Sequence, residues 1–250
     1  MFIWPALFSE FMGKSFECSY PGSELPLFAQ ARNWKSYIKF EVGPYLIGDV
    51  LEVGAGIGGT TIALNDGSAR QWLCLEPDPN QAKHLRLFLP RNSGPVPALI
   101  VGSLAALAQK PTFDCILYID VLEHIEDDCL QIQTAAQLVR PGGHIVVLSP
   151  AHEWLFSEFD KNIGHRRRYN KRTLGKLMPP KWKEIKLKYL DSIGVFLSLG
   201  NVMALRQSLP TSSQLELWDR ICVPLSRAFD RVLLGTFGKS LLAVWQNPAH

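Results

Sequence analysis

Three short stretches of the chain combine glycine, acidic, histidine and arginine residues at spacings that can support chemistry. The first runs from Val50 to Thr61 as VLEVGAGIGGTT, and its apolar start leads directly into Gly54, Gly56 and Gly58. Glycine accepts positive φ angles and lets a ligand approach the backbone closely. A strand, a glycine turn and a helix in this order predict the nucleotide-binding corner of a Rossmann-type sheet.

Two acidic residues near this turn indicate the kind of nucleotide. Glu52 lies two residues before Gly54, where a carboxylate would repel a pyrophosphate but attract the cationic end of S-adenosylmethionine (SAM). Glu76 follows a second apolar run about 20 residues further on, where a carboxylate can bind both ribose hydroxyls. The turn also satisfies the dinucleotide pattern G-x-G-x-x-G. A nicotinamide-dependent oxidoreductase is therefore an alternative, although the chain has no Tyr-x-x-x-Lys pair.

The second stretch runs from Asp120 to His124 as DVLEH. Its histidine and a later one, His152, are candidate general bases. His124 follows an apolar run and Asp120, and His152 follows another apolar run. The reference pKa of histidine suits proton transfer near neutrality. The alternative for His124 is a buried histidine that orients the backbone, and for His152 a loop histidine bonded to a carbonyl. Glu123 is expected to be a first-turn acid that complements a helix dipole.

The third stretch runs from Asp160 to Tyr169 as DKNIGHRRRY. Its arginines can form bidentate hydrogen bonds with a phosphate or carboxylate, which would suit an anionic acceptor. The alternatives are a solvated basic loop and a structural ion pair to Asp160, and we expect the ion pair for at least one arginine. His165, Arg168 and Tyr169 are the candidate acceptor contacts, and Tyr169 is expected either beneath the loop or against the acceptor.

The elements that must position these residues alternate along the chain. The expected strands cover 48–53, 71–76, 97–101, 113–119 and 144–149. The expected helices between them cover 59–67, 79–89, 103–108 and 127–139. Such alternation implies a parallel sheet with right-handed crossovers, with ligands at the carboxyl ends of the strands. Outside this core we expect a helix over 31–42, a strand over 182–190, two or three apolar helices over 193–234 and a last strand over 240–245.

These segments together resemble the class I SAM-dependent methyltransferases. The glycine turn with Glu76 is similar to their first two motifs, and residues 113–125 and 138–147 are similar to their fourth strand and the turn into their fifth. Gly-His-x-Arg-Arg-Tyr at 164–169 resembles an element of a bacterial, small-molecule subset of the methyltransferase 11/12 type. The resemblance implies an α/β, Rossmann-like sheet that is mostly parallel, with an antiparallel last strand, helices on both faces and a helical insertion before that strand.

The resemblance also implies how the chain is organised and where SAM binds. Residues 1–44 would form a cap, 45–150 the SAM-binding core and 151–250 the acceptor side. Tyr37 would reach the methionine carboxylate, with core packing as its alternative, and Ser103 would bond the adenine in place of an acid common in the family. The complete implied set of SAM contacts is Tyr37, Glu52, Gly54, Ala55, Gly56, Glu76, Pro77, Ser103, Leu104, Asp120 and Val121. No metal is expected, because the sulfonium is already a good electrophile.

Composition limits the remaining function classes. The chain has 250 residues, 47% of them apolar, and a net charge of +3, which suits one α/β domain and is too mild to indicate nucleic-acid binding. Its five cysteines are scattered without a C-x-x-C pair, as in a cytosolic protein with reduced thiols. Within the apolar 193–234 insertion, residues 215–234 are expected to form an amphipathic helix that packs its apolar face on the core. The alternatives for the insertion are a lid over an apolar acceptor, a dimer contact or a basic helix on a membrane surface.

The sequence therefore predicts a SAM-dependent methyltransferase that acts on a small-molecule or lipid-like acceptor and releases S-adenosylhomocysteine (SAH). O-methylation with His152 or His124 as the base is favoured, and C- or N-methylation of a natural product is the alternative. A non-catalytic SAM or SAH binder is more distant. We expect a cytoplasmic monomer or homodimer, with peripheral membrane contact as an option.

Overall fold

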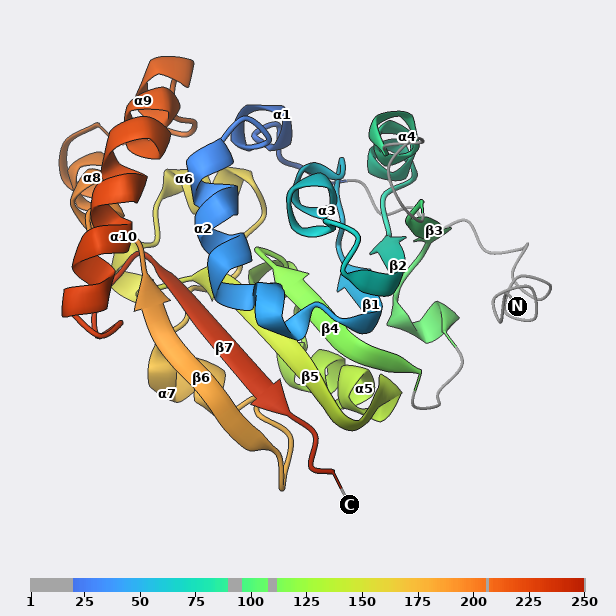
Figure 1. The fold of residues 1–250 in the computed structure, drawn as a ribbon. Helices are drawn as coiled ribbons and strands as arrows, with labels where there is room; N and C mark the ends of the chain where they lie inside the picture. Colours follow the sequence, from blue (N-terminus) through green and yellow to red (C-terminus); the bar gives the residue numbers. More distant parts are fainter. Residues whose placement is uncertain (1–19, 90–95, 108–111, 206, 250) are drawn as a thin grey trace.

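A computed structural model describes residues 20–89, 96–107, 112–205 and 207–249; the first 19 residues of the predicted cap and the end of the predicted helix 103–108 lie outside this part. Its centre is a seven-stranded sheet of order β3-β2-β1-β4-β5-β7-β6 (Figure 1). The strands are β1 Gly48–Val53, β2 Ala69–Glu76, β3 Ala98–Val101, β4 Phe113–Ile119, β5 Val139–Pro150, β6 Lys183–Leu190 and β7 Ser240–Gln246. Only β7 runs antiparallel to its neighbours within this sheet, so the predicted fold is confirmed.

Helices cover both faces of the sheet (Figure 1). They are α1 Leu25–Phe28, α2 Arg32–Val42, α3 Gly59–Leu64, α4 Pro79–Phe88, α5 Asp128–Leu138, α6 Glu158–Asn162, α7 Lys171–Gly175, α8 Gly194–Gly200, α9 Ser212–Leu217 and α10 Val223–Val232. Short 3-10 turns cover Gly43–Tyr45, Leu104–Ala106, Leu122–His124 and Glu153–Leu155. The second of these replaces the helix expected over 103–108.

The sheet separates two apolar layers. Side chains alternate along each strand, so Val50 of β1 packs with α2 and α10 on one face. Its neighbour Leu51 packs with α5 and α7 on the other face. Burial of both strand faces is typical of parallel sheets covered by helices. The sheet is therefore a rigid support for the loops at the carboxyl ends of its strands.

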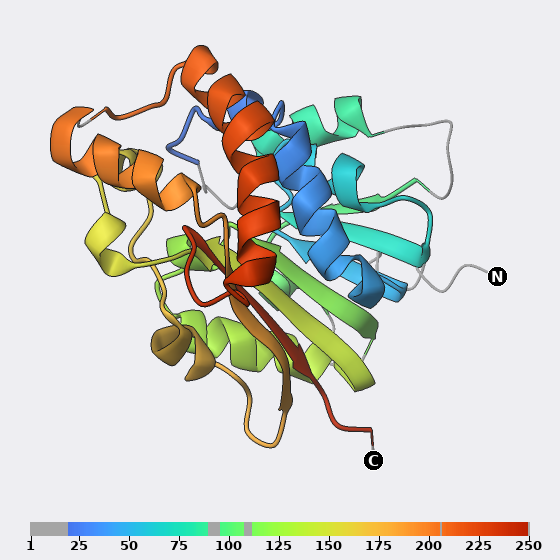
Figure 2. The same ribbon diagram turned by 60° about the vertical axis from the view of Figure 1, so that its left-hand side comes forward.

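The helical insertion packs α10 beside α2 on one face of the sheet (Figure 2). Leu215 and Trp218 are buried against the core, whereas Ile221, Leu225 and Phe229 are about half exposed. The prediction that the apolar side chains of residues 215–234 pack on the core is therefore confirmed for Leu215 and Trp218 and wrong for the three exposed side chains that follow them. None of the described helices is long and apolar enough to cross a lipid bilayer.

Candidate active site

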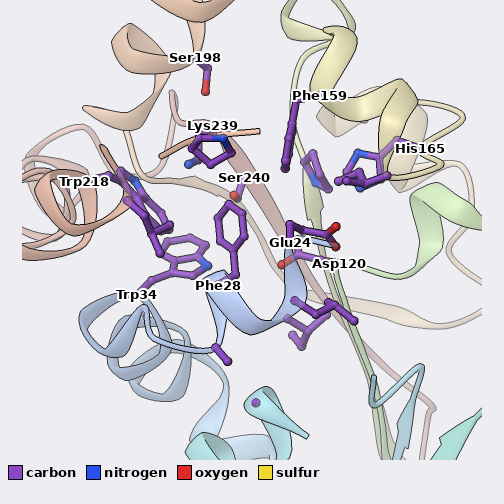
Figure 3. Close-up of a pocket in the computed structure, with 18 of the residues that line it drawn as sticks. Glu24, Phe28, Trp34, Asp120, Phe159, His165, Ser198, Trp218, Lys239 and Ser240 are labelled. Atoms are coloured by element: carbon purple, nitrogen blue, oxygen red, sulfur yellow. The ribbon is translucent and has the colours of Figure 1, made fainter. Parts of the chain in front are cut away.

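A cavity of about 390 Å³ opens at the carboxyl ends of β1 and β4. The glycine turn after β1, the loop after β4 and the 165–168 loop after β5 line one side of it. α2, the insertion and the segment from Tyr20 to Ala29 line the rest. Figure 3 shows Asp120 and His165 on one side of this cavity and Trp34 and Trp218 on the other.

The glycine turn has the conformation that its sequence predicts. Gly54 and Gly56 have φ angles of 69° and 55°, which side chains with a Cβ adopt only at a cost. A Cβ on Gly54 would lie 2.7 Å from Cγ2 of Val121. The amide of Gly56 donates to Glu76 Oε2 at 2.7 Å, so the acid at the end of β2 holds the turn open toward the cavity.

Two charged residues flank this turn inside the cavity. Asp120 directly follows β4 and has a φ of 54°, a conformation that aspartate tolerates better than most residues. Desolvation by the surrounding protein raises the pKa of Asp120 to about 6, although the charge of His165 lowers it. Lys35 of α2 donates to the carbonyl of Phe28 at 2.6 Å, and burial lowers its pKa to about 8 against the attraction of Asp120.

A buried cluster lies directly behind this group. The rings of His124 and His165 are 4.6 Å apart between centroids, and Nε2 of His165 is 3.6 Å from Oε1 of Glu123. Burial raises the pKa of Glu123 to about 8. Burial also lowers the pKa of His124 to about 4, helped by the neighbouring His165. His124 is therefore a neutral imidazole at neutral pH, and it lines the cavity.

Asp160 holds His165 and Arg168 in place. His165 Nδ1 lies 2.8 Å from Asp160 Oδ1, and Arg168 donates to both carboxylate oxygens at 2.9 Å. Burial alone would lower the pKa of His165, but the hydrogen bond to Asp160 and the charge of Glu123 raise it. The structural ion pair predicted for one arginine is thus present, and Arg168 also lines the cavity.

Residues 18–179 match the model of a methyltransferase domain family. This chain belongs to that methyltransferase family. The search of curated proteins finds no match to this chain. Its fold is that of class I SAM-dependent methyltransferases, as three solved structures illustrate.

The first is a SAM-dependent methyltransferase from Mesorhizobium loti, at 16% identity and a TM-score of 0.58, covering 87% of this chain and 98% of that chain. The second is the N-methyltransferase NodS from Bradyrhizobium japonicum WM9 in complex with SAH, at 14% identity and a TM-score of 0.56, covering 94% and 95%. The third is the [4+2]-cyclase SpnF, at 14% identity and a TM-score of 0.58, covering 88% and 82%. At such identities the likeness shows the fold alone.

The methyltransferase brings part of the expected SAM site to the cavity. Gly54, Ala55, Gly56 and Asp120 line it. The other expected contacts are absent from the described lining, namely Tyr37, Glu52, Glu76, Pro77, Ser103, Leu104 and Val121. Val121 packs against the turn, and Leu104 is buried in the α5 layer. These two residues support the site from behind.

The role expected for Glu52 is wrong. Its side chain points away from the cavity into the α2 layer and accepts hydrogen bonds from Thr61 at 2.7 Å and from Trp72 Nε1 at 2.9 Å. Burial raises its pKa to about 7. Because alternate side chains of a strand point to opposite faces, Glu52 cannot act on a ligand at the turn. The argument that it repels a pyrophosphate therefore has no structural basis.

Tyr37 and His152 are also displaced from their expected roles. The Tyr37 hydroxyl donates to Asp230 Oδ2 of α10 at 2.9 Å, so its core-packing alternative holds. His152 does not line the cavity but stacks on Tyr189 with a centroid distance of 4.7 Å. Its backbone has a positive φ of 65°, and its ring is partly buried with Nε2 shielded from solvent. Of the two histidines considered as bases, only His124 reaches the cavity.

Tyr169, the third candidate acceptor contact of the 160–169 stretch, lies beneath its loop. The Tyr169 hydroxyl donates to Asp128 Oδ2 at 2.7 Å, and the side chain is buried away from the cavity. Lys35, Glu123 and Trp218 are features of the site that the sequence analysis did not single out as functional. Each lies in an element whose pattern indicated only packing or a helix terminus, so no local signal distinguished them.

Proposed function

We propose that this methyltransferase binds SAM at the glycine turn and transfers its methyl group to a hydroxyl of a small-molecule or lipid-like acceptor. The observation that carries the proposal is that the glycine turn and a neutral histidine, His124, line the same cavity. A cofactor on the turn and an acceptor at His124 would then be neighbours. Methyl transfer needs little more than this alignment and removal of the acceptor proton.

The charges around the turn suit the amino-acid end of SAM. We assign Lys35 to the methionine carboxylate and Asp120 to the ammonium group, because both line the same cavity as Gly54 and Gly56. Glu76 already accepts hydrogen bonds from the amides of Gly56 and Asp78. A carboxylate has further lone pairs, so Glu76 remains our candidate for the ribose hydroxyls.

The acceptor end of the cavity is apolar and includes the cation Lys239, whose Nζ lies 3.4 Å from the Asp191 carboxylate. Phe159, Leu215 and Trp218 supply apolar surface, and Lys239 lies 4.0 Å above the Trp218 ring. An apolar acceptor with one anionic group fits this lining. In the proposed reaction, His124 accepts the hydroxyl proton while the oxygen attacks the methyl carbon and the sulfur leaves as a neutral thioether.

Calorimetry with SAM, SAH and NADH tests the cofactor assignment. We expect micromolar binding of SAM and SAH and none of NADH. The variant Gly56→Val should abolish this binding, since Gly56 has positive φ and lies beside Leu25. Binding of NADH alone, or undiminished SAH binding by folded Gly56→Val, would contradict the proposal.

Turnover with a panel of phenols, alcohols and amines tests the atom and the base. We expect SAH release with a hydroxyl acceptor, lowered by about 10²–10⁴ in His124→Asn, the usual contribution of a general base. His152→Asn is the matched control because His152 lies outside the cavity lining, and its rate should be unchanged. Turnover with amines alone would instead support N-methylation.

We also propose that the exposed side of α10 contacts an anionic membrane. Ile221, just before α10, and Leu225, Phe229 and Val232 of α10 are between 47% and 79% exposed. The exposed Arg231 lies over the ring of Phe40 on the neighbouring α2. Apolar and cationic side chains on one helix face favour such a surface. Phe229→Ser with Val232→Ser should reduce sedimentation with phosphatidylserine vesicles, whereas Leu130→Ser on α5 should not. Equal sedimentation of all three proteins would contradict this contact.

A further inference from the structure

We propose that Glu123, His124 and His165 form a binding site for one divalent transition-metal cation beside the acceptor cavity. Each residue offers one ligand atom, and these atoms lie within 4.8 Å of one another. One carboxylate oxygen and two imidazole nitrogens are a donor set that suits zinc and related first-row cations. This site goes beyond the sequence analysis, which expected no metal.

Glu123 is the residue that points to a ligand. Its side chain is completely buried, and within the described part of the chain neither of its oxygens has a hydrogen-bond partner of good geometry. Burial raises the pKa of Glu123 and the nearby Ser149 hydroxyl lowers it only in part, and that hydroxyl has no well-formed hydrogen bond of its own. Buried polar groups are normally satisfied, and an unsatisfied carboxylate is costly to bury. The nearest nitrogen, Nε2 of His165, is 3.6 Å away, too far for a hydrogen bond. A cation held between the two groups would satisfy both.

The His165 ring is already held in an orientation that suits a metal ligand. His165 Nδ1 is bound to Asp160 at 2.8 Å, which directs Nε2 toward Glu123. Asp160 is itself held by Arg168 and by the amide of Ser157. A carboxylate that orients a histidine in this way is the usual support of a metal-bound imidazole.

The cluster leaves room for a substrate oxygen. His124 and His165 line the cavity, so a cation bound to them would keep coordination positions open on that side, as catalytic metal sites do. Tetrahedral ligands at about 2.0–2.2 Å from a metal lie about 3.3–3.6 Å apart. The 3.6 Å between Glu123 Oε1 and His165 Nε2 already matches this spacing. Ligand atoms at the 4.8 Å limit of the cluster would need to close by about 1.2–1.5 Å.

The catalytic part of this inference rests on the proposed O-methylation, whereas cation binding does not. A bound cation acidifies a coordinated hydroxyl. The acceptor hydroxyl would then release its proton to water in the open cavity before the oxygen attacks the methyl carbon, and His124 would serve as a ligand of the cation instead of accepting that proton. The need for His124 is the same in both cases.

Cation titration of the whole chain tests the site. Protein freed of metal with EDTA is titrated with Zn²⁺ by calorimetry and with Co²⁺ by visible absorption. We expect one cation per chain and ligand-field bands of bound Co²⁺. Glu123→Gln and His124→Gln should each weaken binding by at least about 100-fold, because each removes one of only three protein ligands. His84→Gln is the matched control, since His84 is an exposed histidine on α4, and its titration should equal that of the wild type.

SAH binding, measured on the same samples, keeps the outcomes apart. Glu123→Gln that binds SAH normally but has lost Zn²⁺ supports the site and shows that the variant is folded. Wild-type protein that binds SAH but no Zn²⁺ or Co²⁺ overturns the inference and leaves the proposed function standing. Cation binding that Glu123→Gln leaves unchanged also overturns it. Loss of SAH binding with intact cation binding contradicts the proposed function alone.

Discussion

The two sides of the cavity are built in different ways. On the cofactor side, Gly54 and Gly56 adopt positive φ angles and Glu76 binds the Gly56 amide, so backbone conformation defines the surface. On the acceptor side, side chains that are distant in the sequence meet. The amide of Trp34 donates to Asp219 at 2.9 Å across 185 residues.

This contrast teaches which parts of the chain carry the common chemistry and which carry specificity. A backbone cradle depends on a few glycines and tolerates change elsewhere. A surface made by buried ion pairs and an inserted helical segment can be rebuilt without disturbing the sheet. The similarity to the cyclase SpnF agrees with the general rule that function resides in sites placed on a shared fold.

The ion pair on the acceptor side gives the largest expected effect. Arg168→Met removes two hydrogen bonds to Asp160 in a pair whose side chains are 7% and 0% exposed. Breaking a buried pair leaves an uncompensated charge, so the free energy of unfolding should fall by about 3 kcal/mol. Urea denaturation measures this loss.

The neighbouring Arg166 is the matched control. Its side chain is 50% exposed and lies 3.6 Å from an exposed Glu126 carboxylate. Exposed ion pairs contribute about 0–1 kcal/mol, so Arg166→Met should change unfolding little. Equal destabilisation by both variants would show that the arginine triplet acts as a single charge patch. The claim that Arg168 stabilises the fold more than Arg166 would then be wrong.

The glycine turn gives the next effect, on the cofactor side. Gly54→Ala forces a Cβ into positive φ, at a cost of roughly 1–2 kcal/mol, and places it 2.7 Å from Val121. Relief of this contact must displace the turn or the loop after β4. We expect SAH affinity to fall by about 100-fold, which is about 2.7 kcal/mol. Calorimetry measures the affinity, and thermal unfolding checks that the protein is folded.

Gly67→Ala is the matched control, because it introduces the same positive-φ strain at a position outside the glycine turn. Gly67 has a φ of 91°, and a Cβ there would meet no atom within 4 Å. Its variant should lose about 1 kcal/mol of stability and keep the affinity for SAH. If both alanine variants bound SAH equally, the turn would not be the cofactor cradle.

Sequence reasoning worked where structure is local. The strand positions, the glycine turn and the pairing of one arginine with Asp160 follow from apolar runs, glycine spacing and charges within eight residues of each other. It failed for Glu52 because the sequence shows that a residue is next to a turn but not to which face of the strand it points. The actual partners of Glu52, Thr61 and Trp72, lie 9 and 20 residues away.

The acceptor side was harder for the same reason. Tyr37 binds Asp230 across 193 residues, and no local pattern announces that contact. His152 and His124 both follow strand ends, and the sequence does not reveal that the His152 ring stacks on Tyr189 whereas His124 lines the cavity. Glu123 resembles an ordinary helix acid until its complete burial is known.

Substitution of Lys35 gives the smallest expected effect. It sharpens the comparison of the two sides of the cavity, because Lys35 is a side chain from α2, distant in the sequence from the glycine turn, on the side that backbone conformation otherwise defines. Lys35→Met keeps the shape of the side chain and removes its charge. A charge-assisted hydrogen bond contributes about 1.5–3 kcal/mol, so SAH affinity at neutral pH should fall by at least about tenfold. Burial lowers the pKa of Lys35 to about 8. Its charge, and with it the advantage of the wild type, should therefore disappear as the pH rises through that value.

Calorimetry of both proteins across this pH range makes the measurement. The amino group of SAH titrates in the same range, but it does so equally for both proteins, so only the ratio of their affinities reports on Lys35. Binding to the wild type should take up protons near the pKa of Lys35, because a bound carboxylate favours the charged amine. A ratio that stays constant with pH would show that the charge of Lys35 does not bind SAH. Its role would then be the hydrogen bond to the Phe28 carbonyl. The cofactor side would then be a backbone surface alone.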